Sequence, residues 1–176
     1  TLTLSGTTNV DVATLDASSL SSHLTISGLT TKAGANIALG SGNNTLTVAE
    51  ADLLIDAANI AGGDGTDVLS ISDAATIIDN DFTSITSVET ITNGTTNAAQ
   101  TITLGSAADA TGIATITGNG SGKETITVGA GFDNALSIAT GTGVDQIDAS
   151  ASTAAITVTA TATSITATDT LKGGSG

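Results

Sequence analysis

Several residue types that most globular domains use are missing from this sequence. It has no Cys, Pro, Met, Trp, Tyr or Arg, and Phe82 and Phe132 are the only aromatic residues. Without Cys the chain forms no disulfide, and His23 has no second His or Cys with which to build a usual zinc site. Aromatic side chains bury the most area each. Their scarcity predicts a thin core of Ile, Leu, Val and Ala in a narrow, elongated structure.

Positive charge is also scarce. Three Lys residues face 17 acidic residues, so the net charge is -14. Because Lys and Arg make the contacts to phosphate groups, we expect binding to neither nucleic acid nor an anionic membrane. Repulsion between the acidic groups destabilises a compact state unless cations neutralise it. An abundance of Thr, Ile and Val nevertheless argues against disorder.

Long apolar runs are absent as well. No stretch of about 18 apolar residues is available to span a bilayer, so we expect a chain that does not cross the membrane. The chain begins without Met and ends with Gly173-Gly174-Ser175-Gly176, which looks like half of a turn motif. We therefore expect a fragment of a longer protein.

Short runs that alternate apolar and polar residues recur along the whole chain. Ile102-Thr103-Leu104 and Ile126-Thr127-Val128 are examples, and each is followed by Gly, a turn former. In the second half, the leading apolar residues are about nine to eleven residues apart, as expected for strands joined by turns. They are Ile116, Ile126, Leu136, Ile147, Ile156 and Ile165.

This regular spacing favours an all-β fold, a parallel β-roll or β-helix solenoid with two or more short strands per coil of about 18–22 residues. The alternative is a β-sandwich, in which strands pair antiparallel and are spaced less regularly. We expect residues 61–176 to form the solenoid and residues 1–60 to form a less regular region of β-strand repeats.

Two segments depart from the simple repeat. Ala49–Ala58 (AEADLLIDAA) contains residues that favour a short helix. Asp79–Thr92 (DNDFTSITSVETIT) reads as a loop followed by one long strand, with Phe82 filling a gap beneath it. The acidic pair Asp79 and Asp81 then belongs to a solvated loop.

The Gly-rich stretch Thr117–Asp133 (TGNGSGKETITVGAGFD) offers two interpretations, a phosphate loop or metal-binding turns. A phosphate loop needs Gly-x-x-x-x-Gly-Lys-Ser/Thr between a strand and a helix. Counted back from Gly122-Lys123, the first position is Thr117 rather than Gly, and Glu124 stands where the hydroxyl should be. Strand sequence follows instead of a helix, so we reject the nucleotide-binding interpretation.

The calcium-binding nonapeptide Gly-Gly-x-Gly-x-Asp-x-U-x, with U large and apolar, fits better. Gly62–Ser70 (GGDGTDVLS) matches at every specified position, and relaxed copies occupy residues 119–127, 128–136 and 140–148. Glycines allow positive φ, which turns carbonyl oxygens toward one point, and the sixth-place carboxylate adds charge. The predicted calcium-binding residues are Gly63, Asp64, Gly65, Asp67, Gly120, Gly122, Glu124, Gly129, Gly131, Asp133, Gly141, Gly143 and Asp145.

The coil length predicts how these turns are arranged. Gly120–Glu124 should face Gly141–Asp145, 21 residues further on, while Asp133 should lie on the opposite edge. Residues 39–47 keep the glycines of the pattern but carry Asn44 in sixth place, from which we expect a plain turn. The alternative for the whole set is glycine turns with solvated carboxylates and no metal.

Gly62–Ser70 and its relaxed copies resemble the RTX (haemolysin-type) calcium-binding repeats. The strands rich in Thr, Ala and Gly, together with the run Phe82–Ile91 (FTSITSVETI), resemble repeat regions of RTX-type bacterial surface-layer (S-layer) proteins and cell-surface adhesins. The resemblance implies Ca²⁺ as cofactor, type I secretion, folding outside the cell and self-assembly on its surface. Other parts of the chain would then contact cell-surface polysaccharide or lipopolysaccharide.

Our leading hypothesis is a structural segment of a secreted, calcium-stabilised bacterial surface protein that assembles into an S-layer, sheet or fibre. The alternatives are the repeat stalk of a type I-secreted adhesin and the calcium-binding roll of a secreted enzyme or toxin. We expect no enzymatic activity, because no Gly-x-Ser-x-Gly elbow accompanies His23. Asp145 and Asp148 could form a glycosidase pair, but the chain lacks the Trp and Tyr that sugar sites favour.

Overall fold

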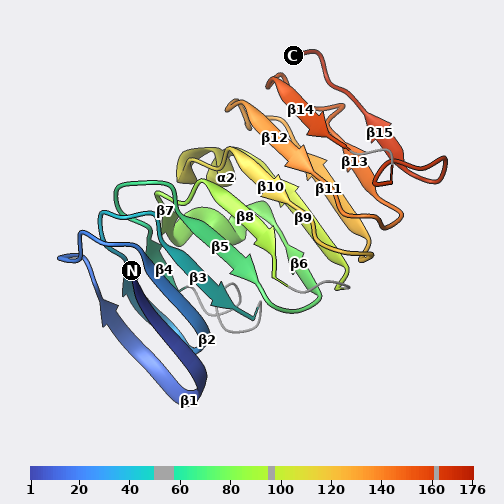
Figure 1. The fold of residues 1–176 in the computed structure, drawn as a ribbon. Coiled ribbons are helices and arrows are strands. Elements are labelled where there is room, and N and C mark those ends of the chain that lie inside the picture. The colour runs from blue at the N-terminus through green and yellow to red at the C-terminus, as the bar shows by residue number, and fades with distance from the viewer. Residues whose placement is uncertain (50–57, 95–97, 161–162) are drawn as a thin grey trace.

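The computed structural model describes residues 1–49, 58–94, 98–160 and 163–176, which form a parallel β-solenoid. Figure 1 shows the strands stacked side by side, with the two termini at opposite ends of the stack. Every strand pair among the described residues is parallel. The predicted solenoid is therefore confirmed, and the antiparallel sandwich is excluded.

One side of the solenoid, face A, runs the full length of the stack. It contains the first halves of β1 and β2 and six shorter strands that follow them in the ladder. The elements are β1 (Leu2–Asp16), β2 (Leu24–Ala38), β3 (Thr45–Val48), β5 (Val68–Ile71), β8 (Thr90–Asn93), β10 (Thr115–Thr117), β12 (Leu136–Ala139) and β14 (Ile156–Thr159).

A row of aliphatic side chains runs through face A and forms much of the core. The row consists of residues paired strand by strand: Leu4, Ile26, Leu46, Leu69, Ile91, Ile116, Ile138 and Val158. The six inner members are buried, whereas Leu4 at the first strand is 45% exposed. Each buried Ile or Leu contributes about 1.5–3 kcal/mol. Because neighbouring members are identical or nearly so, the coils stack without steps in the core.

Two shorter faces complete the coil. Face B is a five-stranded sheet of β6 (Ala75–Ile77), β9 (Gln100–Leu104), β11 (Glu124–Val128), β13 (Gln146–Asp148) and β15 (Thr170–Lys172). Face C pairs the second halves of β1 and β2 with β4 (Asn59–Ala61) and β7 (Ile85–Thr86). The coil that contains β5, β6 and β7 passes along all three faces.

Most coils have the predicted length of 18–22 residues: five of the seven steps between paired core residues of face A are 20 or 22 residues, and the other two are 23 and 25. Paired residues of face A are 20 positions apart at Ile138 and Val158 but 25 apart at Ile91 and Ile116. The longer coil contains the short helix α2 (Ser106–Thr111), which packs on the 3₁₀ helix η1 (Asp79–Ser84) of the coil before it. Inserted helices of this kind lengthen a coil without disturbing the register of the strands.

Asp79 is not the solvated loop residue that the sequence suggests. Its carboxylate accepts hydrogen bonds from the backbone N–H groups of Gly105 (2.7 Å), Ala107 (3.2 Å) and Ala108 (2.9 Å). These are donors at the start of α2, which have no partner within the helix. Asp81 likewise accepts the Ile78 N–H at 2.8 Å. Both carboxylates therefore act as backbone caps.

Two further predictions for this region have different outcomes. Phe82 is buried within η1, as predicted. The prediction of one long strand is wrong, because β7 and β8 are separate strands. Ser87, which lies between them, has a positive φ of 54°. The chain needs this corner to pass from face C to face A.

The region before residue 61 joins the same ladders. β2 pairs with β3 and β4, and β3 pairs with β5, so pairing continues across residue 60. β1 and β2 are nonetheless unusual, with 15 residues each and register shifts between them. The helix predicted over 49–58 lies outside the described residues, except at its two ends. Within the described part of the chain, no helix has the length and apolar character needed to cross a membrane.

The aliphatic row gives a direct test of this packing. We expect Ile116→Ala to lower the free energy of unfolding by about 2–5 kcal/mol, because it leaves a cavity between two equivalent side chains. Thr115→Ala, on the outer side of the same strand, should cost less than about 1 kcal/mol. Urea denaturation measures both values, and equal losses for the two variants would contradict the assigned strand orientation.

Candidate metal sites at the corners of the solenoid

Polar residues occupy one recurring position in the coils, two residues before an aliphatic residue of a strand. On face A this position holds Asn44, Asp67 and Glu89, each just before its strand. On face B it holds Gln100 and Glu124, the first residues of β9 and β11, and Asp145 and Asp169, just before β13 and β15. We call the segments that precede face A strands the A corners and those that precede face B strands the B corners.

The A corners are connected by a chain of hydrogen bonds between coils. The Leu24 N–H donates to Asn44 Oδ1 (3.0 Å), the Asn44 N–H to Asp67 Oδ1 (2.7 Å), and the Asp67 N–H to Glu89 Oε2 (2.8 Å). Each side-chain oxygen thus accepts a backbone N–H from the coil before it. Bonds of this kind to a charged acceptor contribute about 1.5–3 kcal/mol each.

Asn44 connects neighbouring coils, whereas the sequence predicts only a plain turn at this position. It is completely buried, and its Nδ2 donates to the carbonyl oxygens of Gly40 (3.0 Å) and Gly62 (3.3 Å), which belong to consecutive coils. Its amide group therefore supplies both an acceptor for Leu24 and donors for two carbonyl groups. This dual capacity explains why an uncharged residue fits here.

Asp67 occupies the same position one coil later but has no donor to offer when ionised. It is completely buried, and its Oδ2 has no hydrogen-bond partner among the described residues. A Cβ atom at Gly62 would lie 2.7 Å from this oxygen and would collide with the carbonyl oxygen of Ser87. The absence of a side chain at Gly62 thus allows the Ser87 carbonyl oxygen and the Asp67 carboxylate to approach its backbone closely.

The pKa of Asp67 reflects these surroundings. Burial raises the pKa of Asp67, hydrogen bonding from Asn44 lowers it, and the Glu89 carboxylate raises it further. Oδ1 accepts the Asn44 N–H, whereas Oδ2 has no hydrogen-bond partner among the described residues. A buried charge in this situation is stabilised by a proton or by a cation.

The glycines of the perfect nonapeptide are needed for two reasons. Gly63 and Gly65 have positive φ, as predicted. In addition, a Cβ at Gly65 would lie 2.9 Å from the carbonyl oxygen of Gly42, one coil earlier. Asp64, between the two glycines, is exposed and lies apart from the buried carboxylate.

The B corners stack as the 21-residue spacing predicts. Thr142 N–H donates to the Gly120 carbonyl oxygen at 2.6 Å, and a Cβ at Gly143 would collide with the carbonyl oxygen of Gly122. The Glu124 N–H donates to Asp145 Oδ1 at 2.9 Å, and the Asp145 N–H to Asp169 Oδ1 at 2.8 Å. Six of the predicted residues are therefore brought together here: Gly120, Gly122, Glu124, Gly141, Gly143 and Asp145.

Two buried carboxyl groups lie next to one another in this stack. Glu124 is 1% exposed; its Oε1 accepts from Asn93 Nδ2 (3.2 Å) and its Oε2 from the Gly141 N–H (3.4 Å). Asp145 is 2% exposed, and its Oδ2 has no hydrogen-bond partner in the described part of the chain. Burial raises the pKa of Glu124 to about 7, and the neighbouring Asp145 raises it as well, while the Asn93 hydrogen bond opposes the shift.

Asp133 lies on the opposite edge, between β11 and β12, as predicted, but it is not equivalent to Asp67. It precedes the core residue Ile138 by five positions rather than two, and it is exposed. Its carboxylate accepts from Thr153 Oγ1 at 3.2 Å, and its own N–H donates to Asp109 Oδ1 at 2.8 Å. The neighbouring Phe132 is buried, so the turn of Gly129 and Gly131 positions an aromatic side chain in the core.

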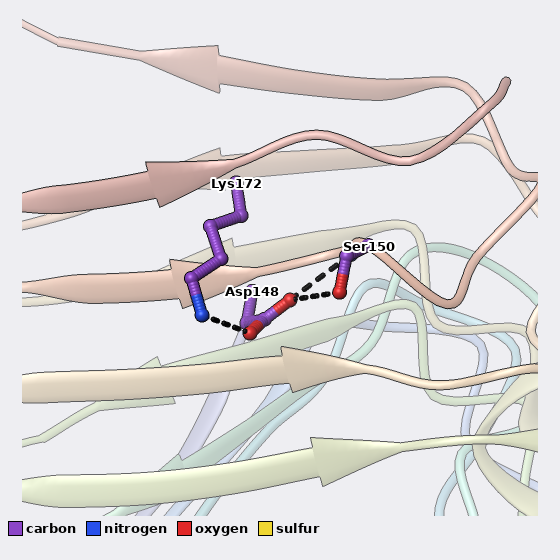
Figure 2. Close-up of polar contacts among 3 residues, drawn as sticks. All are labelled: Asp148, Ser150 and Lys172. Atoms are coloured by element: carbon purple, nitrogen blue, oxygen red, sulfur yellow. Dashed lines mark hydrogen bonds and ion pairs between the residues drawn. The ribbon is translucent and has the colours of Figure 1, made fainter.

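Asp145 and Asp148 do not form a carboxylate pair. Figure 2 shows Asp148 beside Lys172 and Ser150; Asp148 is the last residue of β13 and Lys172 the last residue of β15. Lys172 Nζ lies 2.8 Å from Asp148 Oδ2, and the Ser150 N–H and hydroxyl donate to Oδ1 at 3.1 and 2.6 Å. The hydrogen bonds from Lys172 and Ser150 hold the pKa of Asp148 well below its usual range. Asp145, by contrast, is buried in the B corner.

Side chains alone do not complete a metal site here. Across the described ranges, no three His, Cys, Asp or Glu side chains gather at one point. An ion at Asp67 or Asp145 would therefore take part of its coordination from backbone carbonyl oxygens, which hard cations such as Ca²⁺ accept readily.

Sequence reasoning overlooked Glu89, Asn93, Gln100 and Asp169. Glu89, Gln100 and Asp169 share a signal with Asp67, because each lies two residues before an aliphatic residue of a strand, with a β-branched residue between them. The nonapeptide search required glycines as well and so passed over them. Asn93 carries no such signal, since it contacts Glu124 from 31 residues away.

The raised pKa of Glu124 predicts a pH dependence in the presence of a chelator. The unfolded chain ionises this group at about 4.5 and the folded chain at about 7. Between these values the folded state holds a proton that the unfolded state has lost, so stability falls as pH rises, by roughly 3 kcal/mol in total. Glu124→Gln should remove most of this fall in thermal or urea unfolding from about pH 5 to about pH 8.

Asp64→Asn is the matched control, since it neutralises an exposed carboxylate and should leave the pH profile unchanged. The assignment to Glu124 is wrong if both variants keep the wild-type slope.

Comparisons with known proteins identify no relative of this chain. No protein-family model, no curated protein and no solved structure matches this chain.

Proposed function

We propose that this chain is a structural segment of an extracellular bacterial surface protein, that Ca²⁺ stabilises its corners, and that it self-assembles into an S-layer, sheet or fibre. The single observation that carries the calcium part is the buried Asp67 carboxylate, whose Oδ2 has no hydrogen-bond partner among the described residues and lies near the Ser87 carbonyl oxygen beside Gly62. The RTX-like nonapeptide Gly62–Ser70 contains this residue.

Comparison with the preceding coil supports a cation at this point. At Asn44 the amide nitrogen contacts two glycine carbonyl oxygens, so a donor fills the place between coils. At Asp67 the same position presents only oxygen atoms. Asp67 and the Ser87 carbonyl would hold Ca²⁺ here, and Asp145 with Glu124 would do so at the B corner. Bound calcium would supply the positive charge that these groups lack.

The charge balance agrees with an extracellular setting. The net charge of -14 opposes compaction, and ion binding to the folded state alone adds stability by mass action. Corners with few carboxylates resemble weak extracellular calcium modules, whose affinities are about 10⁻⁴–10⁻³ M. Such sites fill outside the cell and remain empty in the cytosol, which suits a chain that folds after export.

Calcium titration tests the proposal. Once a site is nearly saturated, each tenfold rise in free Ca²⁺ should add about 1.4 kcal/mol of unfolding free energy for that site. Thermal melts followed by circular dichroism, in chelator and over a series of calcium concentrations, measure this slope. Magnesium at matched ionic strength is the control, because its stricter octahedral geometry suits these corners poorly. Identical melting curves in chelator and in millimolar calcium would rule out structural calcium.

Two substitutions exchange the amide and carboxylate side chains of the A corners. Asp67→Asn supplies an amide donor where the cation would bind, so we expect roughly 1–3 kcal/mol more stability in chelator and a smaller calcium response. Asn44→Asp should have the opposite effect, with lower stability in chelator that calcium partly restores. The same melts measure both, and a loss of stability in Asp67→Asn that calcium neither worsens nor repairs would exclude a cation at this corner.

A further inference from the structure

Face A carries no charge on its outer side. The outward positions are the residues on either side of each aliphatic core residue in the strands of face A. Of the 15 whose side chains are described, ten are Thr, three are Ser, and the others are Val68 and Ala139. A face of eight strands without one acidic or basic side chain is unexpected in a chain of net charge -14.

The other surfaces do carry charge. Face B bears Asp148 and Lys172 among its outward residues, and face C bears Asp16. Exposed carboxylates also occur in the corners, at Asp64 and Asp133. Two copies that met through face C or the corners would bring carboxylates together, which opposes association. Contact through face B would cover the Asp148–Lys172 ion pair.

The hydroxyl groups of face A also form a regular array. Neighbouring strands are about 4.8 Å apart, and alternate residues along one strand are about 6.7 Å apart. In-register pairing places Thr90 beside Thr115 and Thr92 beside Thr117. Each Thr presents a methyl group and a hydroxyl that both donates and accepts hydrogen bonds, so the array is complementary to a second copy of itself.

We propose that face A is the surface through which two copies of this chain pack face to face. The proposal deepens the self-assembly in the proposed function by assigning it a surface, but the contact itself does not depend on calcium chemistry. If the two faces cover one another completely about a two-fold axis, the axis passes between β5 and β8, the middle strands of face A.

The size of the face sets the strength of the contact. Eight strands spaced about 4.8 Å apart, each about 12 Å long, present roughly 460 Å² per copy. That is below the roughly 800 Å² per partner of a stable complex. We therefore expect weak pairing of isolated segments, which becomes strong only when many copies repeat it along a layer.

Charge placed on face A tests the proposal. Thr92→Lys with Thr115→Lys puts two like charges near the proposed axis on neighbouring strands of face A. Thr101→Lys with Thr127→Lys places the same charges diagonally on neighbouring strands of face B, which keeps the net charge equal. Sedimentation velocity over a concentration series in millimolar calcium should show association at least tenfold weaker for the first pair and unchanged for the second.

A cysteine variant provides an independent measurement. The chain contains no Cys, so Thr92→Cys introduces one thiol of nearly the size of Thr at the centre of face A. A thiol-specific cross-linker with a span of about 10 Å, the usual distance between packed sheets, should yield dimers of Thr92→Cys, and Thr127→Cys on face B should remain largely monomeric. Wild-type chain that stays monomeric while folded, or equal cross-linking of both variants, would overturn the proposal.

The two proposals fail separately. If calcium leaves the melting curve unchanged but the Lys pair on face A still weakens association, the calcium proposal is wrong and the face A proposal holds. If calcium stabilises the fold but both Lys pairs associate as the wild type does, face A is not the contact.

Discussion

The in-register stacking of equivalent residues in successive coils is the constraint on which the rest of this structure depends. In a parallel solenoid, the nearest neighbours of a residue are the residues about one coil before and after it. Any property of one position is therefore repeated along a row. Aliphatic rows form the core, hydroxyl rows form the outside of face A, and polar rows form the corners. Antiparallel pairing would bring unlike positions together and would form none of these rows.

The same constraint makes the corners chemically demanding. A row of carboxylates about 4.8 Å apart repels itself strongly when it is buried. The chain relieves this repulsion in more than one way. Asn44 replaces a carboxylate by an amide, and the raised pKa of Glu124 favours its protonated form beside Asp145. Asp67 has no amide donor, and its Oδ2 has no hydrogen-bond partner among the described residues, so the cation proposal rests on that residue rather than on the number of acidic residues.

Most acidic groups lie in the corners or at the ends of strands, and this determines which surfaces of the solenoid carry charge. Carboxylates that cap backbone N–H groups, such as Asp79 and Asp109, are used within the fold. Face A is consequently left with hydroxyl and methyl groups alone. In a strongly acidic chain the absence of charge on one face is informative, because that is where repulsion between copies is smallest. The calcium and assembly proposals thus both follow from where the charges lie.

The sequence by itself determined the strands, their parallel stacking and the facing of Gly120–Glu124 with Gly141–Asp145, because these follow from short-range alternation and a nearly constant period. It also indicated the inward position of Phe82. Only the tertiary structure decided the break at Ser87, the role of Asp79 and the contacts of Asn44. Those features depend on which residue of a neighbouring coil lies opposite. Since coil length varies from 20 to 25 residues, that partner cannot be counted along the chain.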